Sequence, residues 1–240
     1  MSYVYYKNPK TKSRKLTSKT KKYIAGSLFA IGLFLIASVV VPIVEFQLEY
    51  SIKFGQIINP LSTKFYNQSG NILGEMTTDY TQLNNWFVAD TSNSTNSSFS
   101  SSNQVSYTIS IPALKIKNAV VNIGGQDLKK SLVQYPQTAL PGQLGNGVIF
   151  GHSVLSQFFN PKSYLTIFAT LYRLQQGDEI YINYDNIQYK YLVEEMFEVQ
   201  PSNLSILEQR FDGKYISLVT CSPPGTTIRR LVVRARIADN

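Results

Sequence analysis

The sequence predicts a mainly β domain, folded as a closed antiparallel or mixed barrel, that follows one transmembrane helix. The first observation is a single uncharged apolar run near the N-terminus, and the second is a series of short strand-like segments separated by turns after residue 105. The third is composition: the 240 residues include 16 Tyr and 13 Phe but one Cys and one His. One Cys excludes an internal disulfide framework and a Cys-based zinc ribbon, and one His excludes a multi-histidine metal site within the chain.

The N-terminal region predicts a membrane anchor. Residues 1–22 contain eight of the 23 basic residues and no acid, so the rest of the chain is formally neutral. Residues 24–44 hold no charge, and as a helix they would rise about 30 Å, the thickness of a bilayer core. We therefore expect a cytoplasmic tail at 1–22, a transmembrane helix at 23–45 and all later residues outside the cell. A nucleic-acid-binding arm and a buried core helix are the alternatives; the adjacent span explains the basic tail without a nucleic-acid partner.

The exported part divides by composition. Residues 46–104 have scattered aromatic side chains without a clear period, and their last part, 91–104, is rich in Ser, Asn and Thr. Such a stretch cannot offset the entropy lost on ordering, so we interpret 91–104 as a flexible linker. Residues 105–240 then form the folded domain. Because the linker separates the stem from this domain, we expect the stem to take no part in its chemistry.

The pattern along the domain predicts each element in turn. Alternation or short apolar runs indicate strands at 105–111, 114–121, 147–150, 179–184, 187–199, 215–221 and 230–237. Asp185 and Asn186 separate two of these strands and predict a tight hairpin. Short helices are expected at 127–134, 164–174 and 202–210.

Three kinds of reactive side chain lie at predicted strand ends. Cys221 ends one strand, His152 follows another, and Arg229 and Arg230 open the next strand across a Ser-Pro-Pro-Gly turn. A free Cys is often a buried hydrophobic residue, and a lone His is often a hydrogen-bonded one. A neighbouring guanidinium, however, favours the nucleophilic thiolate and can bind a developing oxyanion. The combination predicts a nucleophile, a general acid/base and an electrophile, with Cys221 on the rim of the domain.

Strand alternation separates the two arginines. In the last strand, Leu231 and the apolar residues at every second position form one face, which we assign to the barrel interior. Arg230 then lies on the outer wall, and Arg229 has the opposite parity. In the preceding strand Cys221 also falls on the outer face, so Cys221 and Arg230 are expected on one wall.

These residues resemble the motifs of the sortases, the membrane-anchored cysteine transpeptidases of bacterial surfaces. The resemblance covers residues 105–238 and includes the order His, Cys, Arg. Its motifs are Ile111-Pro112, Leu140-Pro141-Gly142, the run from Gly145 to Ser153, Gly177-Asp178-Glu179-Ile180, Ser217-Leu218-Val219-Thr220-Cys221 and Arg230-Leu231-Val232-Val233. Ser217 departs from the family, in which a threonine is common there. The resemblance implies an eight-stranded barrel at 105–240 with the three residues in one groove.

The resemblance also implies roles and partners. Cys221 corresponds to the nucleophile, His152 to the acid/base and Arg230 to the family's arginine, with Arg229 as the second choice. Thr220 corresponds to a substrate-contacting threonine. The implied substrates are surface proteins with a C-terminal, LPxTG-like sorting motif, which are cleaved through a thioester and transferred to an amine of the cell envelope. The implied location is a single-pass anchor in the bacterial cell membrane with the catalytic domain outside.

Several alternatives remain open at this point. Pilin-polymerising sortases often carry an N-terminal lid with an Asp-Pro-aromatic motif; we find neither that motif nor a second apolar span, so we expect a general anchoring role. No cofactor is expected. Calcium activation, used by some relatives, is possible but not indicated, because the cluster Glu194, Glu195 and Glu198 is more typical of a solvated face. A hydrolase that resolves the thioester with water and a catalytically silent binding barrel are the other two alternatives.

Overall fold

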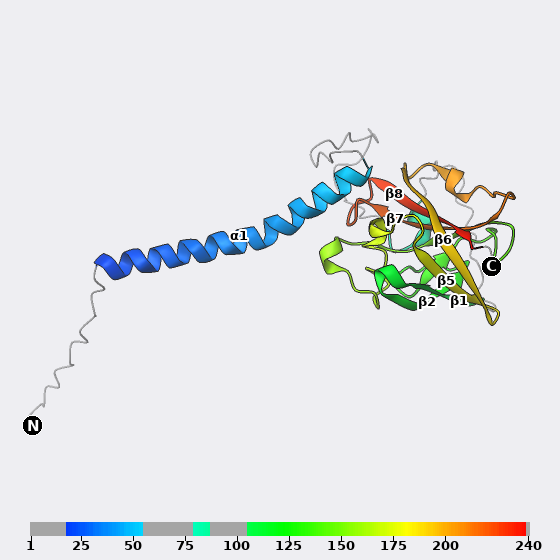
Figure 1. Ribbon diagram of the computed structural model, residues 1–240, viewed down its shortest axis with the longest axis horizontal. Helices are drawn as coiled ribbons and strands as arrows, with labels where there is room; N and C mark the ends of the chain where they lie inside the picture. Colours follow the sequence, from blue (N-terminus) through cyan, green and yellow to red (C-terminus); the bar gives the residue numbers. More distant parts are fainter. Residues whose placement is uncertain (1–17, 55–78, 87–104, 239–240) are drawn as a thin grey trace, which may run out of the picture. The chain divides into compact units, whose positions relative to one another are not determined.

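The computed structural model describes residues 18–54, 79–86 and 105–238, drawn in colour in Figure 1. The chain divides into two compact units between Asn59 and Pro60. The expected flexible linker at 91–104 lies outside the described residues, as does most of the basic tail. The stem expected at 46–104 is described only at 46–54 and 79–86.

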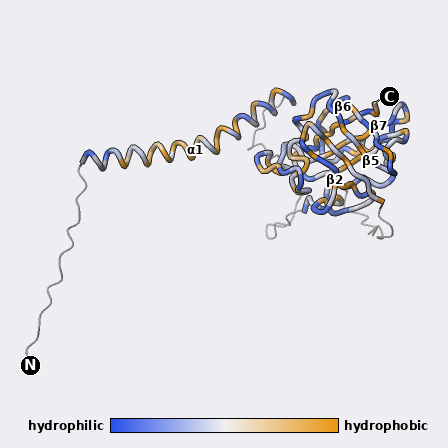
Figure 2. Tube along the Cα trace, turned by 60° about the horizontal axis from the view of Figure 1, so that its bottom comes forward, coloured by the Kyte–Doolittle hydropathy of each residue, from blue (hydrophilic) through white to orange (hydrophobic). Residues whose placement is uncertain are grey.

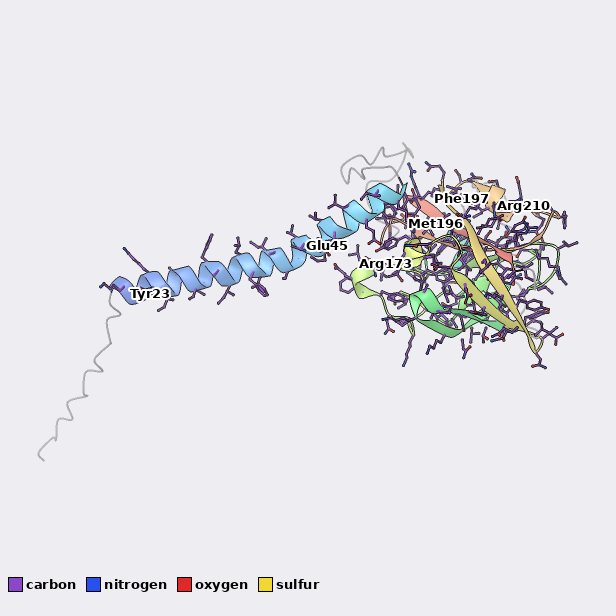
Figure 3. The ribbon with its side chains drawn as sticks, in the orientation of Figure 1. Tyr23, Glu45, Arg173, Met196, Phe197 and Arg210 are labelled. Carbon is purple, nitrogen blue, oxygen red and sulfur yellow. The ribbon has the colours of Figure 1, made fainter. Side chains whose placement is uncertain are left out.

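The first unit contains one helix, α1 (Ser18–Phe54), which is longer than the span expected at 23–45. Its part from Lys22 to Phe54 is long and apolar enough to cross a membrane. Figure 2 shows the hydrophobic run along this helix, and Figure 3 shows side chains projecting around it; its large apolar residues are exposed. A helix that is apolar on all sides is typical of a membrane span or of a protein core. The hydroxyls of Ser27 and Ser38 donate to backbone carbonyls one turn earlier, at 2.9 and 2.7 Å. The two serine hydroxyls of this apolar run are therefore satisfied within the helix, as a bilayer requires.

The second unit is a closed barrel of eight strands, and the expected fold class is confirmed. Around the barrel the strands follow the order β1-β2-β3-β4-β7-β8-β6-β5. Their bounds are β1 (Ser106–Ile111), β2 (Ile116–Ile123), β3 (Leu132–Gln134), β4 (Gly145–Phe150), β5 (Glu179–Tyr184), β6 (Ile187–Val199), β7 (Lys214–Ser222) and β8 (Arg229–Ile237). The pairs β2–β3 and β4–β7 are parallel, and the other pairs are antiparallel.

The expected hairpin between β5 and β6 is present. Tyr184 pairs with Ile187, which leaves Asp185 and Asn186 as a two-residue turn with φ of 52° and 60°. Two successive positive φ values are those of a type I′ turn, in which Asn and Asp are favoured because they tolerate the left-handed region.

The helix expectations are corrected. The segment at 127–134 is not a helix; its end forms β3, whose three residues are too few to show a strand period. Within 164–174 the structure has only the 3-10 segment η4 (Leu171–Arg173), and within 202–210 only η5 (Leu204–Leu207). The other 3-10 segments are η1 (Leu83–Trp86), η2 (Pro112–Leu114) and η3 (Ser156–Phe158).

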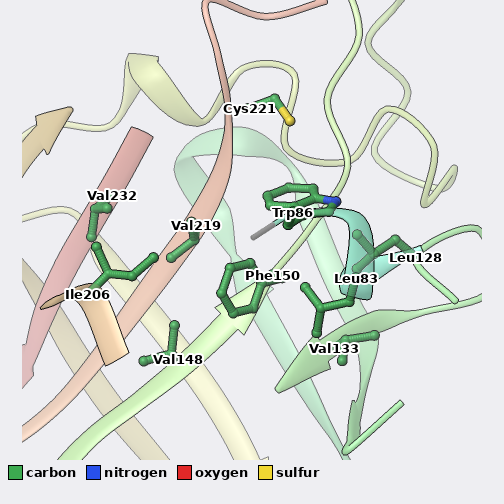
Figure 4. Close-up of a cluster of buried hydrophobic side chains, with 10 residues drawn as sticks. All are labelled: Leu83, Trp86, Leu128, Val133, Val148, Phe150, Ile206, Val219, Cys221 and Val232. Carbon is green, nitrogen blue, oxygen red and sulfur yellow. The ribbon is translucent and has the colours of Figure 1, made fainter. Parts of the chain in front are cut away.

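A row of apolar side chains crosses the outer face of four adjacent strands. Val133, Phe150, Val219 and Val232 are successive cross-strand partners on β3, β4, β7 and β8. These four side chains belong to a buried cluster, shown in Figure 4, that also contains Cys221 and residues outside the barrel strands. Its other members are Leu83, Trp86, Leu128, Val148, Ile206 and Cys221.

Residues 79–86 therefore pack on the barrel, in contrast to the expectation of a separate stem. Leu83 and Trp86 are buried, and the Trp86 ring meets the Phe150 ring edge to face, with centroids 5.5 Å apart. The backbone of this segment is also fixed, since the Leu83 amide donates to the Gln126 carbonyl and the Leu128 amide to the Thr81 carbonyl. The packing depends on long-range partners, so the local sequence pattern could not show it.

We expect Gly147→Ala to destabilise the domain. A β-carbon at Gly147 would lie 2.6 Å from the backbone carbonyl oxygen of Ala139, and a backbone atom cannot move aside cheaply. Overpacking of this kind costs about 1–3 kcal/mol. Chemical denaturation should show a lower midpoint for the variant, and an unchanged midpoint would contradict this packing of β4.

Candidate active site

The parallel pairing of β4 with β7 brings His152 and Cys221 to one end of the barrel. Phe150 pairs with Val219, so His152 and Cys221, each two residues further on, are level with each other. Three hydrogen bonds continue the contact beyond the strands. The Gly151 amide donates to the Val219 carbonyl (3.1 Å), the Thr220 hydroxyl to the Gly151 carbonyl (2.8 Å) and the Ser153 hydroxyl to the Cys221 carbonyl (3.0 Å).

The antiparallel pairing of β7 with β8 adds Arg230. Cys221 and Arg230 are direct cross-strand partners, and Ser222 and Arg229 form the next pair. Partners in an antiparallel sheet point to the same face, so the expectation that Cys221 and Arg230 share one wall is confirmed. Alternation places Arg229 on the other face, where its guanidinium pairs with Glu198 at 3.4 Å.

Cys221 is buried, although the sequence analysis placed it on a rim. Its side chain is 2 % exposed and belongs to the cluster that contains Trp86 and Phe150 (Figure 4). Burial disfavours the thiolate and raises the pKa of the Cys221 thiol to about 11, against a smaller lowering by the positive charge of Arg230. Burial also lowers the pKa of His152. At pH 7 the pair therefore consists of a neutral thiol and a neutral imidazole.

Arg230 is held by backbone carbonyls and aromatic rings. Its guanidinium donates to the carbonyls of Thr227 (3.2 Å), Arg229 (3.2 Å) and Trp86 (3.1 Å). It also lies over the rings of Trp86 and Tyr80, at 4.9 and 5.8 Å from their centroids. Its Nε–H is buried without an acceptor among the described residues, and so is Nδ1 of His152. Both side chains thus keep a buried polar atom that a ligand could satisfy.

A pocket of about 770 Å³ opens beside Cys221 and His152. Exposed apolar side chains, Leu155 and Phe158, form part of its wall, and Asp79 and Lys129 form an ion pair at 3.5 Å on its border. The remaining lining residues are Tyr80, Thr81, Ser153, Val154, Gly225, Thr226 and Thr227. The pocket therefore lies directly beside the thiol, which itself stays buried under residues 79–86.

The sequence analysis missed the part that residues 79–86 play. These residues border the pocket, cover Cys221 and hold Arg230. The Trp86 indole donates to the Tyr80 carbonyl at 2.6 Å, which closes the segment on itself. Asp79 is followed directly by Tyr80, so the segment covers the site without an Asp-Pro-aromatic motif. The missing motif is therefore no longer a reason to prefer a general anchoring role over pilus polymerisation.

Thr220 lies away from the pocket. Its side chain is buried and its hydroxyl donates to Gly151, the residue directly before His152. In this position Thr220 holds the end of β4 against β7, and it does not line the pocket with Cys221.

The acidic cluster on β6 is not a solvated face throughout. Glu195 pairs with Arg234, and Glu198 pairs with Arg229 and accepts a hydrogen bond from Ser222. Among the described residues, no group of three His, Cys, Asp or Glu side chains is arranged to hold a metal ion.

We expect Trp86→Ala to lower the pKa of the Cys221 thiol. Because burial raises this pKa to about 11, removal of the indole should move it back toward its ordinary value of 9.0. The measurement is the rate of iodoacetamide alkylation between pH 7 and 10. For the native protein the rate should rise about tenfold per pH unit over the whole range. For Trp86→Ala it should be faster and level off near the upper end.

Phe158→Ala is the matched control, because this ring lines the same pocket but is exposed and absent from the buried cluster. Its alkylation profile should follow that of the native protein. Circular dichroism during heating would confirm that the Trp86 variant is folded. Identical profiles for native protein and folded Trp86→Ala would show that the indole does not shield the thiol.

Comparison with known proteins identifies the family of the chain. The sortase-domain family model matches residues 109–238. The lid mutant of sortase A from Corynebacterium diphtheriae is 29% identical, with a TM-score of 0.50 over 60% of this chain and 75% of the other. The sortase D5 transpeptidase of Clostridium perfringens is 28% identical, with a TM-score of 0.48 over 57% and 80% of the two chains. No curated protein matches. Because the family model spans more than half of the sequence and includes His152, Cys221 and Arg230, the chain belongs to the sortase family and is a cysteine transpeptidase.

Proposed function

We propose that Cys221 is the nucleophile, His152 the general acid/base and Arg230 the oxyanion-binding residue of this sortase. The observation that carries the assignment is the register of β4, β7 and β8, which brings the three residues to one end of the barrel. The unpartnered polar atoms of His152 and Arg230 support it, because each is a site where a substrate can bind.

The reaction follows from the protonation states. As the Cys221 sulfur attacks the carbonyl carbon of a Thr–Gly-like bond, its proton passes to the neutral His152. The carbonyl oxygen gains negative charge and accepts hydrogen bonds from the Arg230 guanidinium. When the C–N bond breaks, the His152 imidazolium gives its proton to the departing amine, and the acyl group remains on sulfur as a thioester. An amine of the cell envelope then attacks the thioester, His152 takes its proton, and the thiolate of Cys221 leaves.

The contact between Arg230 and Trp86 supports this role for the arginine. The Trp86 carbonyl oxygen accepts a hydrogen bond from Nη2 of Arg230. A substrate carbonyl is the same kind of acceptor, so it can replace Trp86 on the guanidinium without leaving a buried donor unsatisfied. Such an exchange releases Arg230 from the Trp86 carbonyl, while the unpartnered Nε–H offers the substrate a second donor.

We further propose the substrates and the orientation in the membrane. The substrates are surface proteins with a C-terminal, LPxTG-like sorting motif, and the acceptor is an amine of the cell envelope. The eight basic residues within 1–22 support an orientation with the N-terminus in the cytoplasm and the barrel outside. The chemistry described uses side chains of the chain alone, and we propose that it requires neither calcium nor another cofactor.

Mass spectrometry of the full-length protein tests the nucleophile. Incubation with peptides that contain Leu-Pro-x-Thr-Gly should give an acyl adduct on the native protein and none on Cys221→Ala. The variant removes one buried atom, so we expect it to remain folded, with an unfolding transition close to that of the native protein. An adduct of the same mass on Cys221→Ala would contradict the assignment.

The two neighbouring arginines should differ strongly in activity assays. Loss of an oxyanion donor typically costs about 10²–10³ in rate, so Arg230→Ala should lower kcat/KM by that factor. Arg230→Lys should recover little, because an ammonium lacks the planar donor fork of a guanidinium. Arg229→Ala should cost at least about tenfold less, since its side chain points to the other face. The reverse ranking would move the catalytic role to Arg229.

A further inference from the structure

Glu198, near the end of β6, is a buried acid that the proposed reaction does not use. Its side chain is only 7% exposed. One carboxylate oxygen accepts a hydrogen bond from the Ser222 hydroxyl at 2.7 Å, and the other lies 3.4 Å from a guanidinium nitrogen of Arg229. Burial of a charge is costly unless it is paired and hydrogen-bonded, so these two contacts explain how the carboxylate is accommodated.

Ser222 and Arg229, which both contact Glu198, lie at one end of the sheet. Ser222 and Arg229 are cross-strand partners, and they are the last pair of β7 and β8 before the connecting turn. The pair next to them is Cys221 and Arg230. One carboxylate on a third strand thus joins both strand ends beside the proposed catalytic pair. Strand ends beside a turn open most readily, and a joint at this position opposes that opening.

Glu198 cannot itself touch the reacting atoms. It pairs with Leu231 across β6 and β8, and Leu231 precedes Val232 and follows Arg230 on β8. Alternation therefore puts Glu198, Ser222 and Arg229 on the face opposite Cys221 and Arg230. An effect of Glu198 on the positions of Cys221 and Arg230 must therefore pass through the backbone of β7 and β8.

The backbone at this end sets the direction of the Arg230 guanidinium. Nη1 of Arg230 donates to the carbonyls of Thr227 and Arg229, both at 3.2 Å. Arg229 is the residue whose side chain Glu198 holds. A shift of the Arg229 backbone would therefore move Arg230, the cross-strand partner of Cys221. It would also move the Arg229 carbonyl, which is one of the acceptors that orient the Arg230 guanidinium.

We propose that Glu198 is a positioning residue that fixes the Ser222–Arg229 pair and so holds Arg230 against Cys221. This inference rests on the proposed function, and it adds a residue that acts from the far face of the sheet. It also assigns Arg229 to the same unit: its charge is matched by Glu198, and its task is to hold the strand end.

The test is Glu198→Gln in the full-length protein, assayed with a fluorogenic Leu-Pro-x-Thr-Gly peptide. The amide keeps the size of the side chain and an acceptor for Ser222 but removes the charge that holds Arg229. We expect kcat to fall about tenfold, less than the roughly 10²-fold that a 1 Å misplacement can cost, with KM changed less than twofold. Glu195→Gln is the matched control, because Glu195 lies on the same strand and pairs with Arg234 but is 47% exposed. It should leave both constants unchanged.

A double-mutant cycle tests whether Glu198 acts through Arg229. If the two side chains form one unit, Glu198→Gln combined with Arg229→Gln should lose no more activity than the worse single variant. Additive losses would overturn the proposal, as would an effect on KM alone or an equal loss in Glu195→Gln. Thermal unfolding identifies a variant that has lost its fold. In that case Glu198→Asp, which keeps the charge on a shorter side chain, replaces Glu198→Gln. We expect its kcat to fall by less than tenfold, and a native kcat would overturn the proposal.

A readout without substrate separates this inference from the proposed function. A well-placed Arg230 favours the Cys221 thiolate, so Glu198→Gln should slow alkylation of the thiol at pH 8 relative to Glu195→Gln. Removal of a negative charge alone would have the opposite effect, because it also favours the thiolate. If the native protein turned over none of the peptides, the proposed function would fail. The alkylation rates would still decide the role of Glu198, and equal or faster alkylation would overturn it.

Discussion

The parallel pairing of β4 with β7 is the constraint on which the rest of the site depends. Parallel strands end at the same edge of a sheet, so residues that follow β4 and end β7 meet although the chain between them forms β5 and β6. A slip of one residue in this register would turn Cys221 to the other face and remove it from the level of His152. The register is fixed from outside the ladder as well, by the hydroxyls of Thr220 and Ser153, which donate across the two strand ends.

The same outer face must serve both packing and chemistry. The row from Val133 to Val232 needs a cover of apolar side chains, and Leu83 and Trp86 provide it. The cover extends over Cys221, and the loss of water there raises the pKa of the thiol to about 11. At pH 7 a thiol with so high a pKa is almost entirely protonated. The cover formed by Leu83 and Trp86 therefore keeps the Cys221 thiol in its protonated, less reactive form.

The sequence was sufficient for features that repeat locally. Seven of the eight strands, the Asp185–Asn186 hairpin and the shared face of Cys221 and Arg230 follow from alternation and turn residues, and the structure confirms them. The sequence was insufficient for features that depend on contacts between residues far apart in the chain. β3 has three residues and is a strand only because β2 and β4 flank it. Tyr80, Leu83 and Trp86 lie at intervals of three, which could have indicated a packed turn, but only the barrel shows what they cover.

The adjacent residues Arg229 and Arg230 lie on opposite faces of β8 and therefore have different electrostatic surroundings. The charge of Arg229 is neutralised by the carboxylate of Glu198, and this ion pair stabilises the end of β8. Within the described residues, the hydrogen-bond acceptors of Arg230 are carbonyl oxygens of Thr227, Arg229 and Trp86, and none is a carboxylate. A neutral oxygen leaves the positive charge of the guanidinium uncompensated, and the aromatic rings above it keep water away. In the proposed reaction, the arginine that has no acid beside it is the better partner for a developing oxyanion, and strand alternation determines which of the two that is.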